Sequence, residues 1–292
     1  MKIHMFFSTA ILILASCTAS PTAEVKTNAA TPTSKKLTLQ LYSVRDDIAT
    51  DYAGTIKKVG EMGFTAIEAA GYSEGKFYNR TPEEFKADIT NAGMEVLSSH
   101  TNKPLTNKEL MSKNFTEALK WWDEAIKAHK AAGMTYIVDP WMEVPKSLKD
   151  LQTYCEYFNE IGKRCKENGI LFGYHNHAHE FQKVEDKVMF DYMLENTNPD
   201  YVFFQMDVYW VVRGQQSPVD YFEKYKGRFP LLHIKDNKEL GQSGMVGFDA
   251  IFRNLETAGT KHLIVEVEKY SFTPLESVKK SFDYLVNSPF VK

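Results

Sequence analysis

Five times along the chain, a predicted amphipathic helix ends at a glycine that is followed directly by an apolar run. Glycine after the last turn of a helix can take the left-handed conformation that closes the helix. An almost uninterrupted apolar run is typical of a strand buried on both faces. Helices that alternate with such strands predict a parallel sheet covered by helices. The five junctions are at Gly63, Gly93, Gly133, Gly169 and Gly259.

The same alternation extends over most of the chain and gives eight predicted strands. Two of the intervening helices have clear start signals, because Thr81-Pro82-Glu83-Glu84 and Thr273-Pro274-Leu275-Glu276 each place proline at the first helical position. No glycine-rich phosphate-binding or dinucleotide-binding fingerprint follows the first strand. Eight strand–helix units predict an α/β fold, a single closed (β/α)₈ TIM barrel over residues 37–292, and about 250 residues is the usual size of such a barrel. The predicted strands are 37–42, 64–69, 94–99, 134–139, 170–175, 201–207, 229–234 and 262–267.

The N-terminal segment has the order of charge, apolar core and small residues that is typical of a signal peptide. Lys2 precedes an apolar run over 5–15, which is too short to cross a bilayer, and the run is followed by Ser16 and Cys17. The ending LASC resembles the bacterial lipobox. We therefore predict a lipoprotein signal peptide over 1–16, lipidation of Cys17, and a place in the bacterial cell envelope, on the periplasmic or outer-membrane face. Residues 17–36 are rich in Thr, Ala, Pro and Ser, which predicts a disordered tether and contact with the membrane through the lipid only.

Composition excludes several classes of partner and site. The net charge of −3, with 25% charged and 43% hydrophobic residues, is that of an ordinary globular domain. A nucleic-acid partner would require a basic excess that the chain lacks. Apart from Cys17, the cysteines are Cys155 and Cys165, which lie ten residues apart in one predicted helix, and side chains placed in this way do not meet as a disulfide requires. We expect no disulfide framework and no cysteine-rich zinc site.

Polar residues gather at the ends of the predicted strands, where TIM barrels build their active sites. Such side chains are costly to bury unless they are paired or ligated. Four successive strands in the second half each supply a carboxylate or an imidazole, and such a set repels itself unless a cation lies among it. Carboxylates with an imidazole suit Mn²⁺, Mg²⁺, Co²⁺ or Zn²⁺, so we expect one divalent metal ion. The strand-end residues are Gln40, Tyr42, Glu68, His100, Asp139, Trp141, Tyr174, His175, Asn176, His177, His179, Glu180, Asp207, Trp210, His233, Lys235, Glu266 and Glu268.

Many of these residues lie in motifs that follow one another in a fixed order. The motifs are LQLYSVRDD (39–47), GYHNHAHEF (173–181), QMDVYW (205–210), HIKD (233–236) and IVEVE (264–268). They resemble the xylose-isomerase-like TIM barrel superfamily, which holds sugar isomerases, ketose 3-epimerases, inosose dehydratases and endonuclease-IV-type repair enzymes (the AP-endonuclease-2-type barrel). They are most similar to its sugar phosphate isomerase/epimerase branch. The resemblance covers essentially the whole predicted barrel and is specific for the superfamily, not for one reaction.

The resemblance implies that one metal ion is held by Glu, Asp, His and Glu from the last four strands. In the epimerases the first glutamate lies within its strand, where this chain has Tyr174 or His175. The match to Glu180 follows instead a dehydratase-like HxH…E pattern, and a nearby histidine, His177 first, is the alternative ligand. Carried over by matching motif, the implied ligands are Glu180, Asp207, His233 and Glu266.

The expected reaction follows from the metal. A divalent ion that binds a carbonyl oxygen and the neighbouring hydroxyl of a sugar acidifies the carbon-bound hydrogen by stabilising the enediolate, and a second group must take the proton and return it. We predict an isomerase or epimerase in which Glu180 and Glu266 transfer the proton. The alternative is a lyase, dehydratase or hydratase that eliminates water or an aglycone from a keto-sugar or keto-glycoside, with Lys235 and His177 as the acid/base pair. Lys235 has a structural alternative, an ion pair with Glu268 or with the aspartate that follows it in sequence.

The substrate is expected to be a small carbohydrate, because Tyr42, Trp141 and Trp210 offer aromatic surfaces for the apolar face of a sugar ring. An exported protein is not expected to meet phosphorylated sugars, and the strand ends show no basic cluster for a phosphate, so a non-phosphorylated sugar or keto-sugar is favoured. Two other classes stay open: a non-catalytic carbohydrate-binding lipoprotein, and a repair nuclease, which needs more metal ions and a basic groove. The expected substrate-binding residues are Gln40, Tyr42, Glu68, His100, Trp141, His175 and Trp210.

Overall fold

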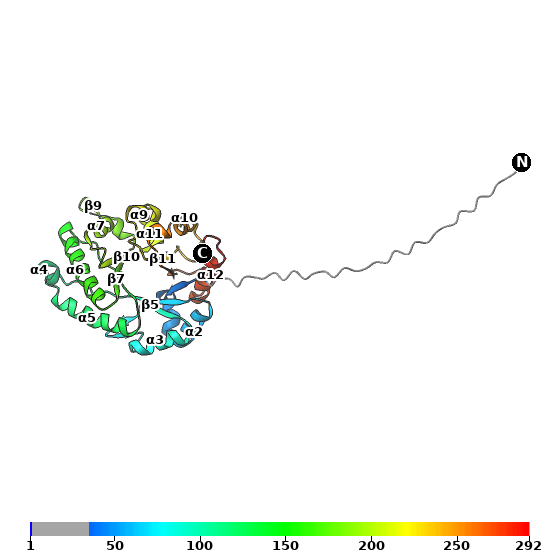
Figure 1. Cartoon of the computed structure of the whole chain (residues 1–292), viewed down its shortest axis with the longest axis horizontal. Helices are drawn as coiled ribbons and strands as arrows, with labels where there is room; N and C mark the ends of the chain where they lie inside the picture. The colour runs from blue at the N-terminus through cyan, green and yellow to red at the C-terminus, as the bar shows by residue number, and fades with distance from the viewer. Residues whose placement is uncertain (2–34, 292) are drawn as a thin grey trace. The chain divides into compact units, whose positions relative to one another are not determined.

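The computed structural model describes Met1 and residues 35–291. Eight parallel strands hydrogen-bond in a closed ring, and helices surround it (Figure 1). Around the ring the order is β1, β12, β11, β10, β7, β6, β5 and β2, and β2 pairs with β1. This confirms the predicted (β/α)₈ barrel. The strands are β1 (Leu37–Gln40), β2 (Ala66–Ala69), β5 (Glu95–His100), β6 (Tyr136–Asp139), β7 (Leu171–His175), β10 (Val202–Asp207), β11 (Leu231–Lys235) and β12 (His262–Glu266).

Each predicted strand overlaps one observed strand and differs from it by at most two residues at either end. The first ends early because the Gln40 side chain accepts a hydrogen bond from the backbone N–H of Tyr42 (3.0 Å) and caps a 3₁₀ turn, η1 (Leu41–Val44). The predicted glycine junctions are confirmed, because all five glycines have φ between +76° and +104°. At Gly259 a side chain is excluded twice, since a Cβ would also lie 2.7 Å from the Cα of Gly227.

Helices fill the intervals between the strands. The two predicted helix starts are confirmed: the Thr81 side chain accepts from the Glu84 N–H at α3, and the Thr273 side chain accepts from the Glu276 N–H at α12. Cys155 and Cys165 are free and buried in α6, as expected. The helices are α1 (Arg45–Thr50), α2 (Tyr52–Glu61), α3 (Pro82–Asn91), α4 (Asn107–Ser112), α5 (Thr116–Ala131), α6 (Leu148–Glu167), α7 (Met189–Asn196), α8 (Val208–Arg213), α9 (Pro218–Lys224), α10 (Phe248–Arg253), α11 (Leu255–Ala258) and α12 (Pro274–Asn287), with a second 3₁₀ turn, η2 (His179–Phe181).

The interior of the barrel changes from apolar to polar along the strands. Because strand side chains alternate with a period of two, Leu231, His233 and Lys235 share one face of β11, and Ile264 and Glu266 share one face of β12. The apolar members pack in a separate small cluster inside the ring, whereas the large core fills the space between strands and helices. The polar members lie at the carboxyl ends of the same strands. The apolar cluster consists of Ala66, Leu97, Tyr136, Val138, Leu231 and Ile264.

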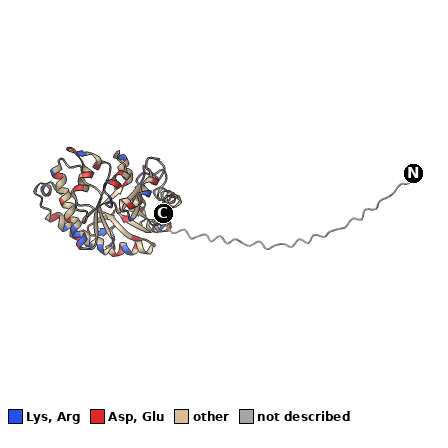
Figure 2. Cartoon of the chain, turned by 45° about the horizontal axis from the view of Figure 1, so that its top comes forward, with Lys and Arg blue, Asp and Glu red and all other residues tan. Residues whose placement is uncertain are grey.

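Two short hairpins extend the loops at the carboxyl ends of the strands, β3 (Tyr72–Ser73) with β4 (Lys76–Phe77) after β2, and β8 (Lys183–Val184) with β9 (Lys187–Val188) after β7. Along the ribbon, the positions of lysine and arginine are interspersed with those of aspartate and glutamate (Figure 2). No helix among the described residues is long and apolar enough to span a membrane.

The predicted signal peptide, Cys17 and most of the predicted tether lie outside the described residues. At the end of the tether, Lys35 donates hydrogen bonds from Nζ to the carbonyl oxygens of Leu285 (3.2 Å), Val286 (2.7 Å) and Ser288 (2.9 Å). Carbonyl groups at the end of a helix lack partners within the helix. Lys35 therefore joins the barrel by satisfying the end of α12.

Candidate active site

The carboxyl ends of the strands surround a cavity of about 390 Å³. Six of the residues predicted for the site line it, and they come from both halves of the barrel. The loop after β2 adds Tyr72, and the segment after β5 adds Thr101 and Asn102, three contributors that no motif in the sequence indicated. The six predicted residues are Tyr42, His100, Trp141, His175, His177 and Glu266.

Four buried side chains from the last four strands form a compact donor group at this cavity. His175, Asp207, His233 and Glu266 each offer one ligand atom, and these atoms lie within 4.8 Å of one another. Three of the four, Asp207, His233 and Glu266, are ligands implied by the sequence. Two imidazoles with two carboxylates suit a divalent ion such as Zn²⁺ or Mn²⁺.

Asp207 shows that this group fits a cation. Its Oδ1 accepts a hydrogen bond from the Trp210 N–H (2.9 Å), whereas its Oδ2 is buried and has no hydrogen-bond partner among the described residues. Burial raises the pKa of Asp207 to about 7, although Lys235 lowers it in part. A buried carboxylate oxygen without a partner is costly, and a bound divalent ion would satisfy it.

Glu180 does not join the donor group. His175 occupies the ligand position that the motif match had assigned to Glu180. The Glu180 carboxylate accepts hydrogen bonds from the Tyr174 hydroxyl (2.7 Å) and the His177 N–H (2.8 Å), and it lies 3.1 Å from Nε2 of His179. The reason is the strand period. Tyr174 packs in the large core outside the ring. Glu180 follows the end of β7 by five residues, and its side chain returns to the Tyr174 hydroxyl. His175, the next residue on the strand, faces the interior.

The alternative ligand His177 also lies outside the four-residue group. It belongs to another candidate group, together with His179 and Glu180. In this group His179 Nε2 lies 2.9 Å from the Met142 carbonyl oxygen, and Glu180 is already hydrogen-bonded. His177 itself lines the cavity, and its Nδ1 is buried without a hydrogen-bond partner. Burial lowers the pKa of His177 to about 3, so the ring is neutral near neutral pH.

Lys235 is a buried cation among carboxylates. Its Nζ lies 3.0 Å from Glu266 Oε2 and 2.6 Å from Glu268 Oε2, which is one of the predicted ion pairs. Its Nζ also lies 5.4 Å from the centre of the Trp210 ring. Although burial opposes ionisation, Lys235 and His233 hold the pKa of Glu266 well below its usual range. The ammonium group is therefore positioned to hold a proton beside the donor group.

Glu68 and Gln40, predicted to contact substrate, lie instead beneath the cavity and are fully buried. Glu68 accepts hydrogen bonds from Gln40 Nε2 (2.8 Å), Ser98 Oγ (2.6 Å) and Gln205 Nε2 (2.8 Å), and it lies 2.6 Å from His233 Nε2. Burial opposes ionisation, but the neighbouring imidazoles hold the pKa of Glu68 below its usual range. The role of Gln205 was missed, although its place two residues before Asp207 on one strand face signalled it.

Trp141 separates three hollows at the mouth. It is 43% exposed and packs against the rings of His177 and His179, with centroids 5.0 Å and 4.5 Å away. It lines the 390 Å³ cavity, a cavity of about 420 Å³ beside Asp139 and a cavity of about 500 Å³ beside Trp210. Trp210 is largely buried and packs on His177, with centroids 5.5 Å apart. Asp139 faces the second cavity rather than the donor group.

The chain is similar to two solved structures of a sugar phosphate isomerase/epimerase from Parabacteroides distasonis. One is 34% identical, with 90% of this chain and 98% of that chain covered and a TM-score of 0.83. The other is 33% identical, with 88% and 100% covered and a TM-score of 0.82. A structure described as IOLI protein with a binding zinc atom is 14% identical, with 87% and 99% covered and a TM-score of 0.66, and it shows the fold alone.

The barrel, the place of the donor group and these likenesses agree with one family. Residues 56–288 match the family described as xylose isomerase-like TIM barrel. Two of these structures carry the name sugar phosphate isomerase/epimerase, and this points to an enzyme of the general isomerase/epimerase kind. The chain belongs to the xylose isomerase-like TIM barrel family.

Proposed function

We propose that this protein is a divalent-metal-dependent isomerase or epimerase that removes a proton from the carbon next to the carbonyl of a non-phosphorylated sugar or keto-sugar. The observation that carries the proposal is the buried donor group at the cavity, in which Asp207 Oδ2 has no hydrogen-bond partner among the described residues. The name sugar phosphate isomerase/epimerase of the two Parabacteroides distasonis structures supports the general kind of reaction, whereas the preference for a substrate without phosphate rests on the lining of the cavity.

The metal would be held by the four-residue donor group. When bound, a divalent ion supplies Lewis acidity to a substrate carbonyl and to the hydroxyl beside it. The chain contributes its own geometry, because the four donors come from four adjacent strands of one rigid ring. Donors placed on strands keep their positions better than donors on loops. The list of proposed ligands is His175, Asp207, His233 and Glu266.

Proton transfer is proposed to involve His177, Glu266 and Lys235. His177 lines the cavity, and its buried Nδ1 has no hydrogen-bond partner among the described residues. Lys235 holds its proton on Nζ between Glu266 and Glu268. A base and an acid near the same cavity can take a proton from one position of a substrate and deliver one to another. Glu180, the second base expected from the sequence, is occupied by Tyr174.

A second candidate reaction is the elimination of water or an aglycone from a keto-sugar or keto-glycoside. It is favoured by the position of Glu180 outside the donor group. A pair of glutamates would suit proton return to the carbon, whereas an imidazole and an ammonium group suit proton removal coupled to protonation of a leaving oxygen. The adjoining cavity of about 500 Å³ shares Trp141 and His177 with the first. It offers room for an aglycone next to the reacting ring.

The cavity favours a substrate without phosphate. Among the described residues that line it there is no lysine or arginine, and the two carboxylates of Glu266 and Glu268 are part of its wall. A phosphate group is usually held by arginine, lysine or a helix N-terminus. An exported protein would also be separated from cytoplasmic sugar phosphates. The envelope location is proposed from the sequence alone, and labelling with a radioactive fatty acid that is lost in Cys17→Ser would test it.

The reaction is tested by incubating protein loaded with Mn²⁺, Co²⁺ or Zn²⁺ with free sugars, keto-sugars and keto-glycosides in D₂O. Deuterium uptake at carbon without loss of water or aglycone supports isomerisation or epimerisation, and release of either supports elimination. Carbohydrate binding without turnover or exchange would show a binding protein. Binding of abasic DNA with strand cleavage would show a nuclease.

Two variants connect turnover to the proposed site. Asp207→Ala and His233→Ala are expected to lose both bound metal and turnover, because each removes a buried ligand. Glu180→Gln is the matched control, since its side chain is equally buried but lies outside the donor group. Unchanged metal content in the Asp207→Ala/His233→Ala double variant would contradict the assignment.

A further inference from the structure

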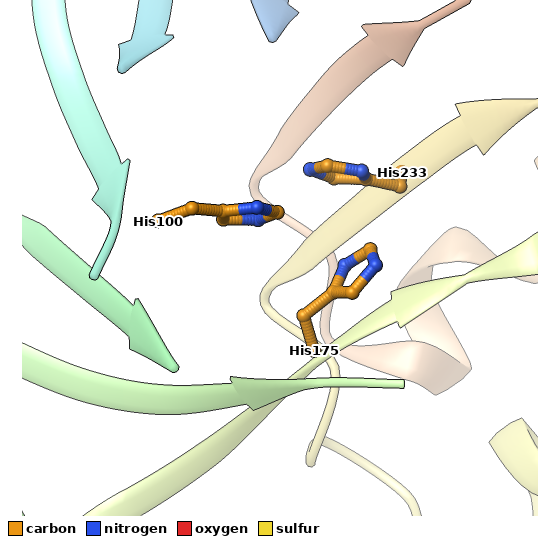
Figure 3. A group of neighbouring side chains, drawn as sticks. All are labelled: His100, His175 and His233. Atoms are coloured by element: carbon orange, nitrogen blue, oxygen red, sulfur yellow. The ribbon is translucent and has the colours of Figure 1, made fainter. Parts of the chain in front are cut away.

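Gln205 is a buried amide that connects two histidines, His100 and His175, to the carboxylate of Glu68. It lies on β10, two residues before Asp207 and on the same face of the strand. Its Oε1 lies 2.8 Å from His100 Nε2 and 3.0 Å from His175 Nδ1, and its Nε2 donates to Glu68 Oε2 over 2.8 Å. The rings of His100, His175 and His233 point toward one another (Figure 3), and Gln205 Oε1 lies within hydrogen-bond distance of the first two.

The orientation of this amide is fixed by Glu68. An ionised carboxylate only accepts hydrogen bonds, so the NH₂ end of Gln205 must face it and the oxygen must face the histidines. Glu68 is itself held by hydrogen bonds from Gln40 (2.8 Å) and Ser98 (2.6 Å). A flipped amide would place its oxygen against a carboxylate oxygen in a buried site, which is costly.

The amide orientation determines which ring nitrogens carry protons. An amide oxygen only accepts hydrogen bonds, so His175 donates from Nδ1 and His100 donates from Nε2. The remaining lone pairs are then on His175 Nε2 and His100 Nδ1. Glu68 acts in the same way on His233, whose Nε2 donates to Glu68 Oε1 over 2.6 Å, leaving Nδ1 3.2 Å from Glu266 Oε2.

We propose that Gln205, oriented by Glu68, is a positioning residue that sets the tautomer of His175 and, together with Glu68 Oε1 at 3.1 Å, that of His100, and so prepares one ring for a metal ion and the other for substrate. His175 belongs to the four-residue donor group, and its Nε2 is the nitrogen left with a lone pair. His100 lines the cavity, where Nδ1 can accept a hydrogen bond from a sugar hydroxyl. Partners that fix the tautomer of a ligand histidine typically change metal affinity by about 10- to 100-fold.

The tautomer assignment is tested first on the wild-type protein without metal. Two-dimensional ¹H–¹⁵N spectra of the histidine rings distinguish Nδ1–H from Nε2–H. We expect the Nδ1–H form for His175 and the Nε2–H form for His100. The opposite form at either ring in wild-type protein would overturn the proposal, so the test does not depend on a variant that folds.

The variant Gln205→Leu then removes the amide with little change in size. We expect mixed tautomers at His175 in its metal-free spectra, whereas His100 keeps its Nε2–H because Glu68 Oε1 lies 3.1 Å from that nitrogen. We also expect Co²⁺ binding by calorimetry that is about 10- to 100-fold weaker than in wild type. The control is Gln152→Leu, which removes a glutamine that accepts a hydrogen bond from Tyr192 far from the donor group. Unchanged tautomers and unchanged Co²⁺ affinity in Gln205→Leu would overturn the role of Gln205.

The metal-binding part of this inference rests on the proposed function, and one more variant separates the two. If Asp207→Asn binds Co²⁺ as tightly as wild type, the proposed metal site fails, whatever Gln205 does. If Asp207→Asn loses Co²⁺ while Gln205→Leu keeps both its affinity and its tautomers, the site stands and the positioning role fails. The visible absorption of bound Co²⁺ gives a second readout, because its intensity depends on the number and geometry of the ligands.

Discussion

His129 gives the protein a loss of stability in acid that a single substitution should reduce. The residue is fully buried on α5. Its Nδ1 lies 2.6 Å from the Ala125 carbonyl oxygen, to which it must donate, so its Nε2 accepts from the Thr101 hydroxyl at 2.9 Å. Burial lowers the pKa of His129 to about 4, and the carbonyl contact offsets only part of this shift. A second ring proton would face a buried hydroxyl that is already shared with Ser99.

The size of the effect follows from the two pKa values. The unfolded chain takes up this proton near pH 6.5, whereas the folded protein does so only near pH 4. Between these values the unfolded state binds more protons, so the free energy of unfolding rises with pH. At pH 7.5 the contribution is close to zero. At pH 4.5 it destabilises the fold by roughly 2–3 kcal/mol, because each pKa unit corresponds to about 1.4 kcal/mol.

The measurement is the free energy of unfolding in urea at pH 7.5 and at pH 4.5, for wild type and for His129→Gln. Glutamine keeps a polar group at this position but does not titrate. We expect the loss of stability between the two pH values to be roughly 2–3 kcal/mol smaller in the variant. His262→Gln is the control, because burial also lowers the pKa of His262 but the residue is partly exposed, so its effect should be smaller. Equal pH dependence in wild type and His129→Gln would refute the reasoning.

Three further predictions concern packing and the donor group. Gly162→Ala should lower the free energy of unfolding by about 1–3 kcal/mol in urea titrations, because a Cβ would lie 2.2 Å from the Tyr201 carbonyl oxygen; wild-type stability would contradict this. Trp122→Phe should lower the free energy of unfolding by about 1–3 kcal/mol, since the indole N–H donates to the buried Tyr157 hydroxyl over 2.8 Å. A smaller loss in Trp122→Phe than in Trp122→Ala would separate the contribution of the hydrogen bond from that of packing. His175→Ala should weaken Co²⁺ binding by about tenfold or more, whereas Glu180→Gln should leave it nearly unchanged; calorimetry that gives the reverse order would restore the motif-based ligand.

The barrel could be predicted because its signals are local. Each junction glycine reports a helix end, and each apolar run reports a strand buried on both faces, so the count of eight needs no knowledge of contacts. Asp207, His233 and Glu266 could be predicted for a related reason, because each stands at the last or third position of its strand on the interior face. The period of two then places their side chains inside the ring.

The first ligand could not be predicted in the same way. Glu180 follows β7 by five residues, and a loop of that length can return to either side of the sheet. A motif match counts residues but does not say which side the loop takes. The decision depends on Tyr174, whose hydroxyl holds Glu180 outside the ring. His175, the last residue of β7, lies on the interior face of the strand, but the motif match had assigned the ligand position to Glu180.

The burial of Gln40 and Glu68 depended on contacts between distant residues. Both side chains face the barrel interior, as their strand positions indicate. Their removal from the cavity results from partners more than 25 residues away, chiefly Ser98 and Gln205. A single sequence does not show that these four polar groups satisfy one another. Their interaction converts predicted substrate contacts into the support beneath the histidines.

The position of Trp141 has a consequence for the capacity of the site. Three hollows of about 390, 420 and 500 Å³ share this side chain as their common wall. The wall is an indole held by two imidazole contacts and one hydrogen bond to Glu143 (3.3 Å). The largest molecule that the mouth can admit is therefore governed by one rotamer, and a change at this residue would resize three compartments together.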